Sequence, residues 1–234
     1  ASATAAVTRS FGRTPEIDDA PIRALHGYGT VTAAAWLDVP LLLAAQRQEL
    51  LKNGQLTETQ VTEEDMRYTP DGVRIGEVHG RWLVRCAGPF AELPGLIPVK
   101  GETLTVRIPG LHLSRMVHRG IFLLPLGENV YRVGATFKWE ELWDGPTEEA
   151  RTWLMERLTA LVDAPIAVLD QQCGVRPTSK DRRPIMGMTA EHEAVLNGFG
   201  SRGVMLAPWC AQHLLDHLFA GTPLDPEVDR GRCA

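Results

Sequence analysis

Three glycines near the C-terminal end of the sequence have the spacing of an anion-binding turn. Gly198, Gly200 and Gly203 spell G-x-G-x-x-G between an apolar run, residues 194–197, and a helix-like run. Glycines let a backbone approach a ligand closely, and a helix start presents free N–H groups and a partial positive charge. The turn therefore suits an anion or the electron-rich edge of a ring. A plain strand-to-helix connection would have the same pattern, because a single G-x-G-x-x-G is a weak motif.

The same spacing binds dinucleotides when a second strand follows the helix and ends at an acidic residue that binds the ribose. Asp225 and Asp229 are near the required distance, but they lie among prolines and not at the end of a strand. The turn is therefore not predicted to be a Rossmann site. The two interpretations that remain are a ligand-facing turn and a plain connector.

Two helices upstream of the turn are predicted from capping residues and hydrophobic periodicity. The first begins after the N-cap Asp38, has Pro40 in its first turn and ends at Asn53-Gly54. The second begins after Thr147 and runs to about residue 162. Its apolar face should consist of Ala150, Leu154, Leu158 and Leu161.

Strands are predicted in most of the remaining chain. Residues 121–126 and 130–137 read as a hairpin around Gly127-Glu128-Asn129. Further strands are expected at residues 56–61, 66–69, 73–78, 81–88, 102–108, 164–177 and 194–197, and a last helix ends near residue 220. The fold class is therefore mixed, α/β or α+β, and not a regular βαβ series. We expect an antiparallel sheet largely from residues 100–140, with the helix after Thr147 on one face.

Composition limits the classes of function. The 234 residues, 44% hydrophobic and 23% charged, are enough for one large or two small domains. The net charge of −5 and dispersed basic residues do not favour a nucleic-acid partner. No run approaches the roughly 20 apolar residues that span a bilayer, and no signal peptide is evident, so we expect no membrane association.

Cysteines and histidines do not predict a metal site. The four cysteines are too far apart for a C-x-x-C motif, and we interpret them as reduced thiols of a cytoplasmic protein. They are Cys86, Cys173, Cys210 and Cys233. His213 and His217 are four residues apart, but the glutamate that follows the first histidine in zincins is absent.

A second motif precedes the glycine turn by a short spacer. Residues 173–187, CGVRPTSKDRRPIMG, and then residues 197–211 follow the ordered patterns GxRPxxxDxxPxxG and NGxGxxGxxxAPxxA. This pair resembles the C-terminal part of D-amino-acid-oxidase-type FAD-dependent oxidoreductases, which include glycine oxidase, sarcosine oxidase and the flavin domain of a tRNA wobble-uridine modification enzyme. The stretches RWLVRCAGPFA, PVKGETLTV and YRVGATFKWEE agree with that family in the same order. The resemblance extends from about residue 27 to the end.

The resemblance implies an FAD cofactor, a small-molecule amine or amino-acid substrate and a set of site residues. Arg176, the arginine of G-x-R-P, is the implied catalytic residue, since its guanidinium would hold and orient the substrate carboxylate. The implied cofactor-binding residues are Val61, Ala87, Gly88, Gly174, Gly198, Gly200, Ser201, Arg202 and Gly203. Val61 would meet the adenine, and Ala87 and Gly88 the ribityl and phosphate groups.

The turn from Gly198 to Gly203 would face the pyrimidine side of the flavin. A side chain at Gly200 or Gly203 is expected to push the cofactor away or to force an unfavourable φ. Phe122 departs from the family, because glycine-oxidase-like members often have a tyrosine there, whose hydroxyl helps to bind the carboxylate. This departure favours a bulkier secondary amine over a simple α-amino acid.

The family's dinucleotide fingerprint, in its first βαβ unit, has no counterpart before residue 198. We therefore expect residues 1–88 to be a partial FAD-binding segment, residues 89–170 an antiparallel-sheet substrate domain, and residues 171–234 a return to the FAD-binding domain. The leading hypothesis is an FAD-dependent oxidoreductase, or the larger C-terminal part of one, that oxidises a C–N bond. The alternative is a non-catalytic truncated domain, acting as a binding module or as a subunit that associates with another chain through the face left by the missing unit.

Overall fold

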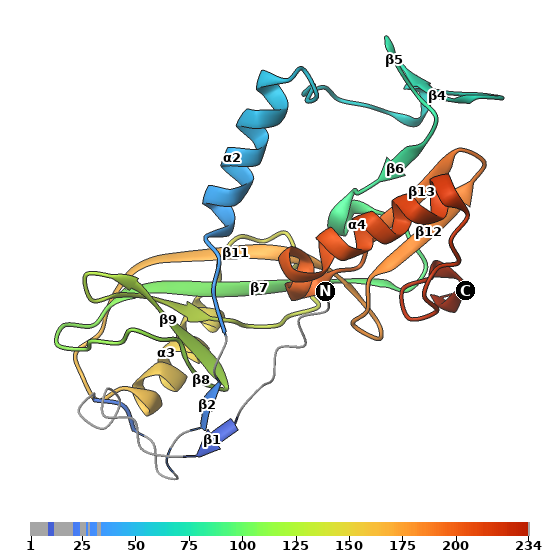
Figure 1. The fold of residues 1–234 in the computed structure, drawn as a ribbon. Helices are drawn as coiled ribbons and strands as arrows, with labels where there is room; N and C mark the ends of the chain where they lie inside the picture. Colours follow the sequence, from blue (N-terminus) through green and yellow to red (C-terminus); the bar gives the residue numbers. More distant parts are fainter. Residues whose placement is uncertain (1–8, 12–20, 24–26, 28, 32–33, 234) are drawn as a thin grey trace. The chain divides into compact units, whose positions relative to one another are not determined.

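The computed structural model describes residues 9–11, 21–23, 27, 29–31 and 34–233 (Figure 1). The chain divides into two compact units. The first unit consists of residues 1–35 and 99–175, and the second of residues 36–98 and 176–234. The second unit thus consists of two segments, one before and one after residues 99–175.

The first unit is built on a five-stranded sheet with the order β11-β7-β10-β9-β8. Its strands are β7 (Leu96–Arg107), β8 (Val117–Arg119), β9 (Ile121–Gly127), β10 (Val130–Gly134) and β11 (Ala167–Ser179). β10 is antiparallel to both β7 and β9, and β8 is antiparallel to β9. A separate antiparallel pair, β1 (Arg9–Phe11) and β2 (Gly29–Val31), belongs to the same unit. The predicted antiparallel sheet is confirmed.

The predicted hairpin joins β9 to β10 through a two-residue loop. Gly127 pairs with Val130, which leaves Glu128 and Asn129 in the loop. Both loop residues have positive φ, 52° and 59°. A two-residue loop with positive φ at both positions is the turn whose twist matches the flanking strands. This turn sets the register of the strands at the centre of the sheet.

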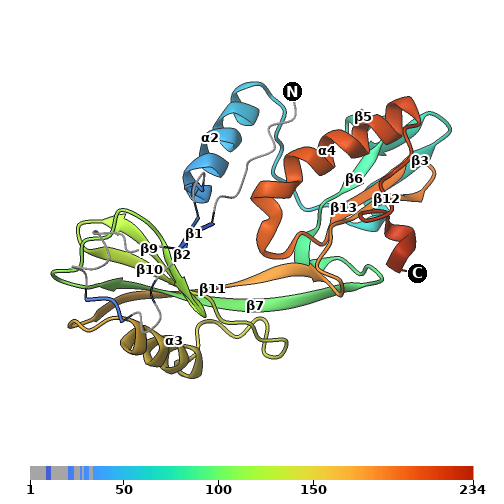
Figure 2. The same cartoon turned by 60° about the horizontal axis from the view of Figure 1, so that its bottom comes forward.

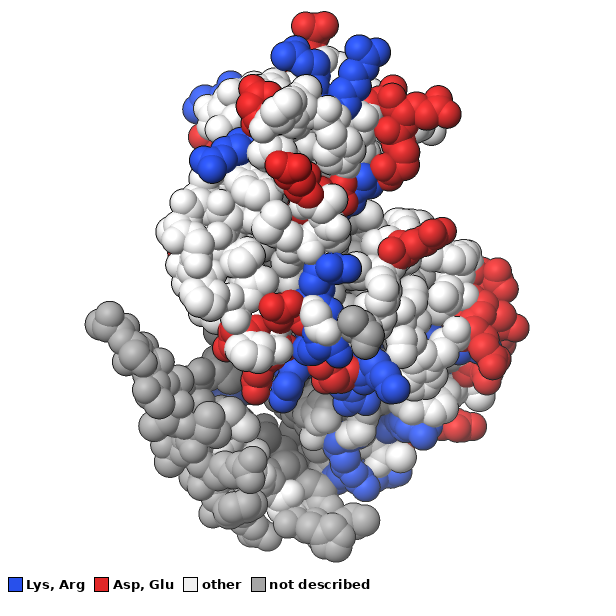
Figure 3. Space-filling view, turned by 90° about the vertical axis from the view of Figure 1, so that its right-hand side faces the viewer, with Lys and Arg blue, Asp and Glu red and all other residues white. Residues whose placement is uncertain are grey.

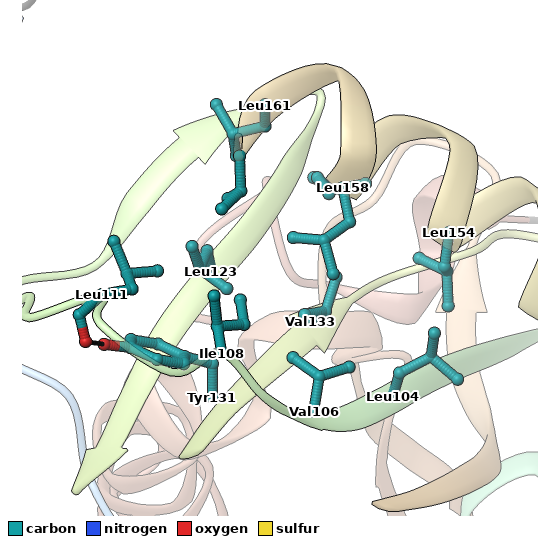
Figure 4. Packing of buried hydrophobic residues seen from close by; sticks show 12 residues of the cluster. Leu104, Val106, Ile108, Leu111, Leu123, Tyr131, Val133, Leu154, Leu158 and Leu161 are labelled. Carbon is teal, nitrogen blue, oxygen red and sulfur yellow. Dashed lines mark hydrogen bonds between the residues drawn. The ribbon is translucent and has the colours of Figure 1, made fainter. Parts of the chain in front are cut away.

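One face of the sheet packs on helix α3 (Glu148–Leu161) (Figures 2 and 4). Thr147 is the N-cap and accepts a hydrogen bond from the backbone N–H of Ala150 at 3.3 Å. The four buried residues of α3 are those predicted from its periodicity: Ala150, Leu154, Leu158 and Leu161. Leu154, Leu158 and Leu161 pack against alternate residues of the strands, and the buried hydroxyl of Tyr131 donates to the carbonyl of Leu111 at 2.5 Å.

The second unit contains two three-stranded sheets, β12-β13-β6 and β3-β4-β5. The strands are β3 (Met66–Thr69), β4 (Gly72–Ile75), β5 (Val78–Gly80), β6 (Leu83–Arg85), β12 (Ile185–Ala190) and β13 (Glu193–Asn197). The helices are α2 (Val39–Lys52) and α4 (Gly203–Ala220), with short 3₁₀ turns η1 (Glu63–Asp65), η2 (Gly88–Phe90), η3 (Gly200–Arg202) and η4 (Arg230–Cys233). β13 runs parallel to β6 and antiparallel to β12.

Helix α4 packs on the β12-β13-β6 sheet through one face. The core of the second unit consists of Met186, Ala194, Cys210, Leu214, Leu218 and Val228. α4 ends at Gly221, which has the left-handed conformation, φ 70°, that glycine adopts without strain. The sheet and α4 together fix the position of the connection between β13 and α4, which is the glycine turn.

The predicted helix after Asp38 is confirmed, and the Asp38 carboxylate accepts a hydrogen bond from the backbone N–H of Leu41 at 3.0 Å. The predicted strand at residues 56–61 is wrong, because this segment is irregular. The alternating polar residues of this segment precede a capping box at the start of η1. In this capping box the side chains of Thr62 and Asp65 each bond the other residue's backbone, and the backbone N–H of Thr62 donates to the Asp65 carboxylate. β12 and β8 were not predicted from the sequence.

Candidate functional site

The glycine turn is tied to the Ala87–Gly88 segment by one buried side chain. Asn197, the last residue of β13, donates from Nδ2 to the carbonyl oxygen of Gly88 at 2.9 Å. Its Oδ1 accepts from the backbone N–H of Gly198 at 2.8 Å. Two of the motifs quoted from the sequence, from distant parts of the chain, therefore meet in the second unit. Asn197 was not among the predicted site residues, although it directly precedes the turn.

Two of the three glycines are required by the chain itself. Gly198 and Gly200 have φ of 74° and 55°, and a Cβ at Gly198 would lie 2.9 Å from Cγ1 of Ile185. A Cβ at Gly200 would lie 3.2 Å from Oγ1 of Thr178. These contacts and the left-handed backbone account for both glycines without any ligand.

Gly203 differs from the other two. Its φ is −53°, and the nearest atom to an added Cβ is Cβ of Phe199, at 3.5 Å. The expectation that a side chain here would force an unfavourable φ is therefore wrong, because Gly203 is the first residue of α4 and has helical geometry. Any need for glycine at this position must come from something that approaches the start of α4.

The start of α4 has no side-chain cap. The side chain of its N-cap residue, Arg202, makes no capping hydrogen bond, and the 3₁₀ turn η3 leads directly into the helix. Ser201 and Arg202 are exposed in η3. Arg202 donates from Nη2 to the carbonyl oxygen of Arg182, so its guanidinium is attached to the loop before β12. The positive end of α4 and this guanidinium together favour an anion at the turn.

Arg176 lies on β11, next to the glycine turn in the second unit. Thr178, two residues further along the strand, forms an isolated antiparallel bridge with Phe199. Arg176 is therefore only about 7 Å along the strand from a residue that contacts the turn. Burial lowers the pKa of the Arg176 guanidinium. An arginine nevertheless keeps its charge at neutral pH, so Arg176 is a half-buried cation.

Gly174, on the same strand, belongs to the first unit. An added Cβ would have no atom within 4 Å, and its φ is not in the left-handed region. Glycine inside a strand weakens it, and it often marks a place where a ligand or another backbone approaches closely. Neither packing nor backbone geometry explains Gly174.

The segment that contains Val61 is attached to β6 by an arginine. Val61 is 39% exposed and precedes η1. Arg85 of β6 holds Glu63 with two hydrogen bonds, of 2.5 and 2.8 Å, and it also bonds Glu193 at 3.0 Å. Ala87 follows Arg85 by two residues and Val61 precedes Glu63 by two, so the bonds between Arg85 and Glu63 hold the segment of Val61 close to the end of β6. A strand arginine in an apolar run was the only sequence feature that could have revealed this link.

Glu193 is the buried acid of this network. Burial would raise the pKa of its carboxyl group, but hydrogen bonds from Thr189, Tyr68 and Arg85 outweigh burial and hold the pKa below 4.5. The hydrogen bonds of Arg85 to Glu63, and to a lesser extent its bond to Glu193, raise the pKa of the Arg85 guanidinium. Glu193 is therefore ionised at neutral pH and paired with Arg85. The network links β3, β6 and β13.

The two histidines of α4 that have metal-ligand spacing make hydrogen bonds within the protein. His213 accepts from the backbone N–H of Asp225 at 2.9 Å and stacks on Trp209, and His217 bonds the carbonyl of Thr222 at 2.8 Å. Within the described ranges no group of three His, Cys, Asp or Glu could hold a metal ion.

None of the helices in the described part of the chain is long and apolar enough to cross a membrane. On the face in Figure 3, basic and acidic side chains lie intermixed.

Two named proteins are similar to parts of this chain. A protein of Rhizobium etli named as the thiamine biosynthesis oxidoreductase ThiO is 35% identical over 156 residues, 61% of this chain and 46% of that protein. The bifunctional tRNA 5-methylaminomethyl-2-thiouridine biosynthesis protein MnmC of Maricaulis maris is 36% identical over 90 residues, 37% of this chain and 15% of that protein. The chain thus spans at most about half the length of these relatives.

Solved structures have the same fold. Iminodiacetate oxidase from Chelativorans sp. BNC1 matches with a TM-score of 0.63 at 20% identity, over 80% of this chain and 57% of that one. Glycine oxidase from Bacillus cereus matches with a TM-score of 0.57 at 24% identity, over 68% of this chain and 49% of that one. The family model described as FAD dependent oxidoreductase matches residues 6–217, which is most of the chain. The mixed fold, the motif order and this match agree, and the chain belongs to the family of FAD-dependent oxidoreductases.

Proposed function

We propose that this chain forms the flavin-facing and substrate-facing parts of an oxidoreductase that oxidises a C–N bond of an amine or amino acid. The observation that carries the proposal is the hydrogen bond from Asn197 to Gly88, because it assembles two motifs that the family uses for its cofactor. A cytoplasmic location is part of the proposal.

The residues present fit the flavin end of FAD. An added Cβ would have no atom within 4 Å at Gly174, and at Gly203 it would make only an ordinary contact of 3.5 Å with Cβ of Phe199, so neither packing nor backbone geometry requires glycine there. The uncapped start of α4 supplies N–H donors and a positive dipole for the negative charge of a reduced flavin. Bound FAD would supply the two-electron oxidation. Gly198, Gly200, Ser201 and Arg202 would line the same turn.

Arg176 would act by orientation. Its planar guanidinium can bind a carboxylate with two parallel hydrogen bonds, and its half-buried position strengthens that interaction. Holding the carboxylate would fix the carbon to be oxidised relative to the cofactor. Val61, Ala87 and Gly88 would contact the remaining parts of FAD, and the Arg85 network would hold them in place.

The test is anaerobic mixing of the FAD-loaded protein with a panel of primary and secondary amines and amino acids. Loss of the oxidised-flavin absorbance by at least one amine, with formation of the corresponding carbonyl compound, supports the proposal. A protein that binds FAD but is reduced by no amine in the panel, while dithionite reduces it, contradicts amine oxidation.

An association role has its own support in the second unit. β6 is a terminal strand of its sheet, so one edge lacks a partner among the described residues. α2 has no buried residue. The outer face of α4 exposes Val204, Met205, Trp209, Leu215 and Phe219. An open edge and an apolar helix face favour contact with another protein segment. Light scattering at several concentrations tests this, and a monomer that stays soluble throughout contradicts self-association.

A further inference from the structure

The connection between β11 and β12, residues 180–184, links the C-terminal segment of the second unit to the start of α4. Arg232, in η4, bonds this connection at Asp181. Arg202, which directly precedes α4, bonds it at Arg182. Two side chains from distant parts of the same unit therefore meet one short connection.

The C-terminal segment is fixed beside β12. Met186 of β12 forms a parallel bridge with Asp229, and its backbone N–H donates to the carbonyl oxygen of Val228 at 2.9 Å (Figure 1). Val228 and Met186 are both buried in the core of the second unit. Nη1 of Arg232 donates to the carbonyl oxygen of Asp229 at 2.9 Å. The Arg232 side chain therefore extends from a backbone that is itself held in place.

The guanidinium of Arg232 binds the carboxylate of Asp181 at two points. Nε donates to Oδ2 at 2.8 Å and Nη2 to Oδ1 at 3.3 Å, and Nη2 also donates to the carbonyl oxygen of Arg183 at 2.9 Å. The Arg232 side chain is only 15% exposed. Its hydrogen bonds, more than any other interaction, hold the pKa of the Asp181 carboxyl well below its usual range. Asp181 is therefore ionised at neutral pH and paired with Arg232.

Asp181 also fixes the backbone of the connection. Its Oδ1 accepts from the backbone N–H of Arg183 at 3.1 Å and from the hydroxyl of the buried Ser179 at 2.9 Å. Arg182 lies between these residues and has the left-handed conformation, with φ 62°. An arginine keeps this uncommon conformation only where surrounding contacts impose it. The contacts of Asp181 and Arg232 therefore set the direction of the Arg182 carbonyl group.

That carbonyl oxygen accepts the hydrogen bond from Nη2 of Arg202. Among the described residues the Arg202 guanidinium has this hydrogen bond and no ion pair. Arg202 is exposed, and a long exposed side chain samples many rotamers unless a contact restrains it. The place of its charge therefore depends on the place of the Arg182 carbonyl group.

We propose that Arg232 is a positioning residue: by holding the connection before β12, it places the guanidinium of Arg202 at the start of α4. This inference rests on the proposed function, in which Arg202 lines the turn that faces the flavin. Arg232 acts through the connection and not by contact with the cofactor. A cation that is already fixed loses less conformational entropy on binding an anion than a mobile one, so Arg232 strengthens FAD binding only while Arg202 is present.

The first part of the experiment observes Arg202 without any cofactor. Its Nε–Hε signal in the proton–nitrogen NMR spectrum is identified by its loss in Arg202→Gln. The signal is then compared in the wild type, Arg232→Gln and Arg183→Gln. Arg183→Gln removes the same charge from the connection itself, but its side chain pairs with Glu227. We expect the Arg202 signal to move in Arg232→Gln and to keep its position in Arg183→Gln.

The second part titrates the same proteins with FAD. Arg202→Gln should bind FAD at least about tenfold more weakly than the wild type, and Arg232→Gln about fivefold more weakly. The variant with both substitutions should bind no more weakly than Arg202→Gln alone. Arg232→Lys keeps the charge but not the two-point contact with Asp181, so its affinity should lie between those of Arg232→Gln and the wild type. Urea unfolding verifies that each variant is folded under the titration conditions.

An unmoved Arg202 signal in Arg232→Gln, additive losses of affinity in the double variant, or an equal loss in Arg183→Gln overturns the inference. If Arg232→Gln does not fold, Asp181→Asn removes the charge of the other partner and gives the same comparison. The two proposals fail separately. FAD binding with an unmoved Arg202 signal refutes only this inference, and a moved signal without FAD binding by the wild type refutes only the proposed cofactor role.

Discussion

The amide of Asn197 donates a hydrogen bond to the carbonyl oxygen of Gly88, 109 positions earlier in the chain. The same side chain accepts from the backbone N–H of Gly198. One buried residue therefore sets the distance between the connection after β6 and the connection after β13. Because these strands are parallel neighbours in one sheet, both connections leave the sheet at the same end.

Replacing Asn197 by alanine should lower the free energy of unfolding by about 1–3 kcal/mol, since it leaves the Gly88 carbonyl and the Gly198 N–H without their partner. Urea unfolding followed by tryptophan fluorescence measures the change. Gln212→Ala removes an exposed side-chain bond to Asp216 on α4 and should change stability by less than about 0.5 kcal/mol. Equal effects of the two substitutions would contradict the structural role of Asn197.

Gly200 and Gly203 should respond oppositely to alanine. Gly200→Ala places a Cβ at φ 55° and 3.2 Å from Thr178, and should cost about 1–2 kcal/mol of stability. Gly203→Ala has helical geometry and room for the methyl group, so it should be neutral or stabilising by up to about 1 kcal/mol. Urea unfolding of both variants is the measurement. A destabilised Gly203→Ala protein would show that the start of α4 is more crowded than described.

The sequence predicts the helices and strands better than it predicts the tertiary contacts between them. The helix after Thr147 was predicted with its four buried residues, because amphipathic periodicity and an N-cap are local properties. The hairpin at Glu128-Asn129 was predicted for the same reason. The strand predicted at residues 56–61 is absent from the structure. Alternation of polar and apolar residues over only six positions does not distinguish a strand from an extended connection.

Local sequence patterns do not predict contacts between segments that are far apart in the chain. Nothing in the spacing of Asn197 or Arg85 shows which residues they bond, because that depends on strand order. The requirement for Gly198 comes from Ile185, on a neighbouring strand. The roles assigned to Arg176 and to the cofactor-binding residues came from resemblance, and they stay predictions.

Arg176→Lys should weaken carboxylate binding by about 2 kcal/mol, or about 30-fold in Kd, since an ammonium cannot form the two parallel hydrogen bonds of a guanidinium. Titration of the FAD-loaded protein with (ethylthio)acetate, followed by the flavin spectrum, measures Kd. Arg183→Lys, in an exposed ion pair with Glu227, is the matched control and should leave Kd unchanged. An unchanged Kd in Arg176→Lys removes Arg176 from the proposed site.

Glu193 should make the second unit sensitive to acid. Its pKa in the folded protein lies below the ordinary 4.5, so its contribution to stability is fully present above that pH and is lost as the pH falls through the folded value. Glu193→Gln should therefore destabilise the protein at pH 7, and the difference from the wild type should shrink on acidification. Urea unfolding from pH 7 to pH 3 measures it, with the exposed Glu191→Gln as control. A difference independent of pH contradicts the ion pair with Arg85.

The central claim is that the start of α4 faces a flavin, and an FAD titration of the wild type and of Gly203→Val tests it most directly. Valine fits the local backbone of Gly203, so urea unfolding of the unliganded variant should remain close to the wild type. It would block close approach of a cofactor to the first N–H groups of α4. We predict that the wild type binds FAD with the absorbance of a bound flavin, and that Gly203→Val binds it at least about tenfold more weakly. Equal FAD affinity in the two proteins, or no FAD binding by the wild type, would contradict the claim and leave the turn as a plain connector.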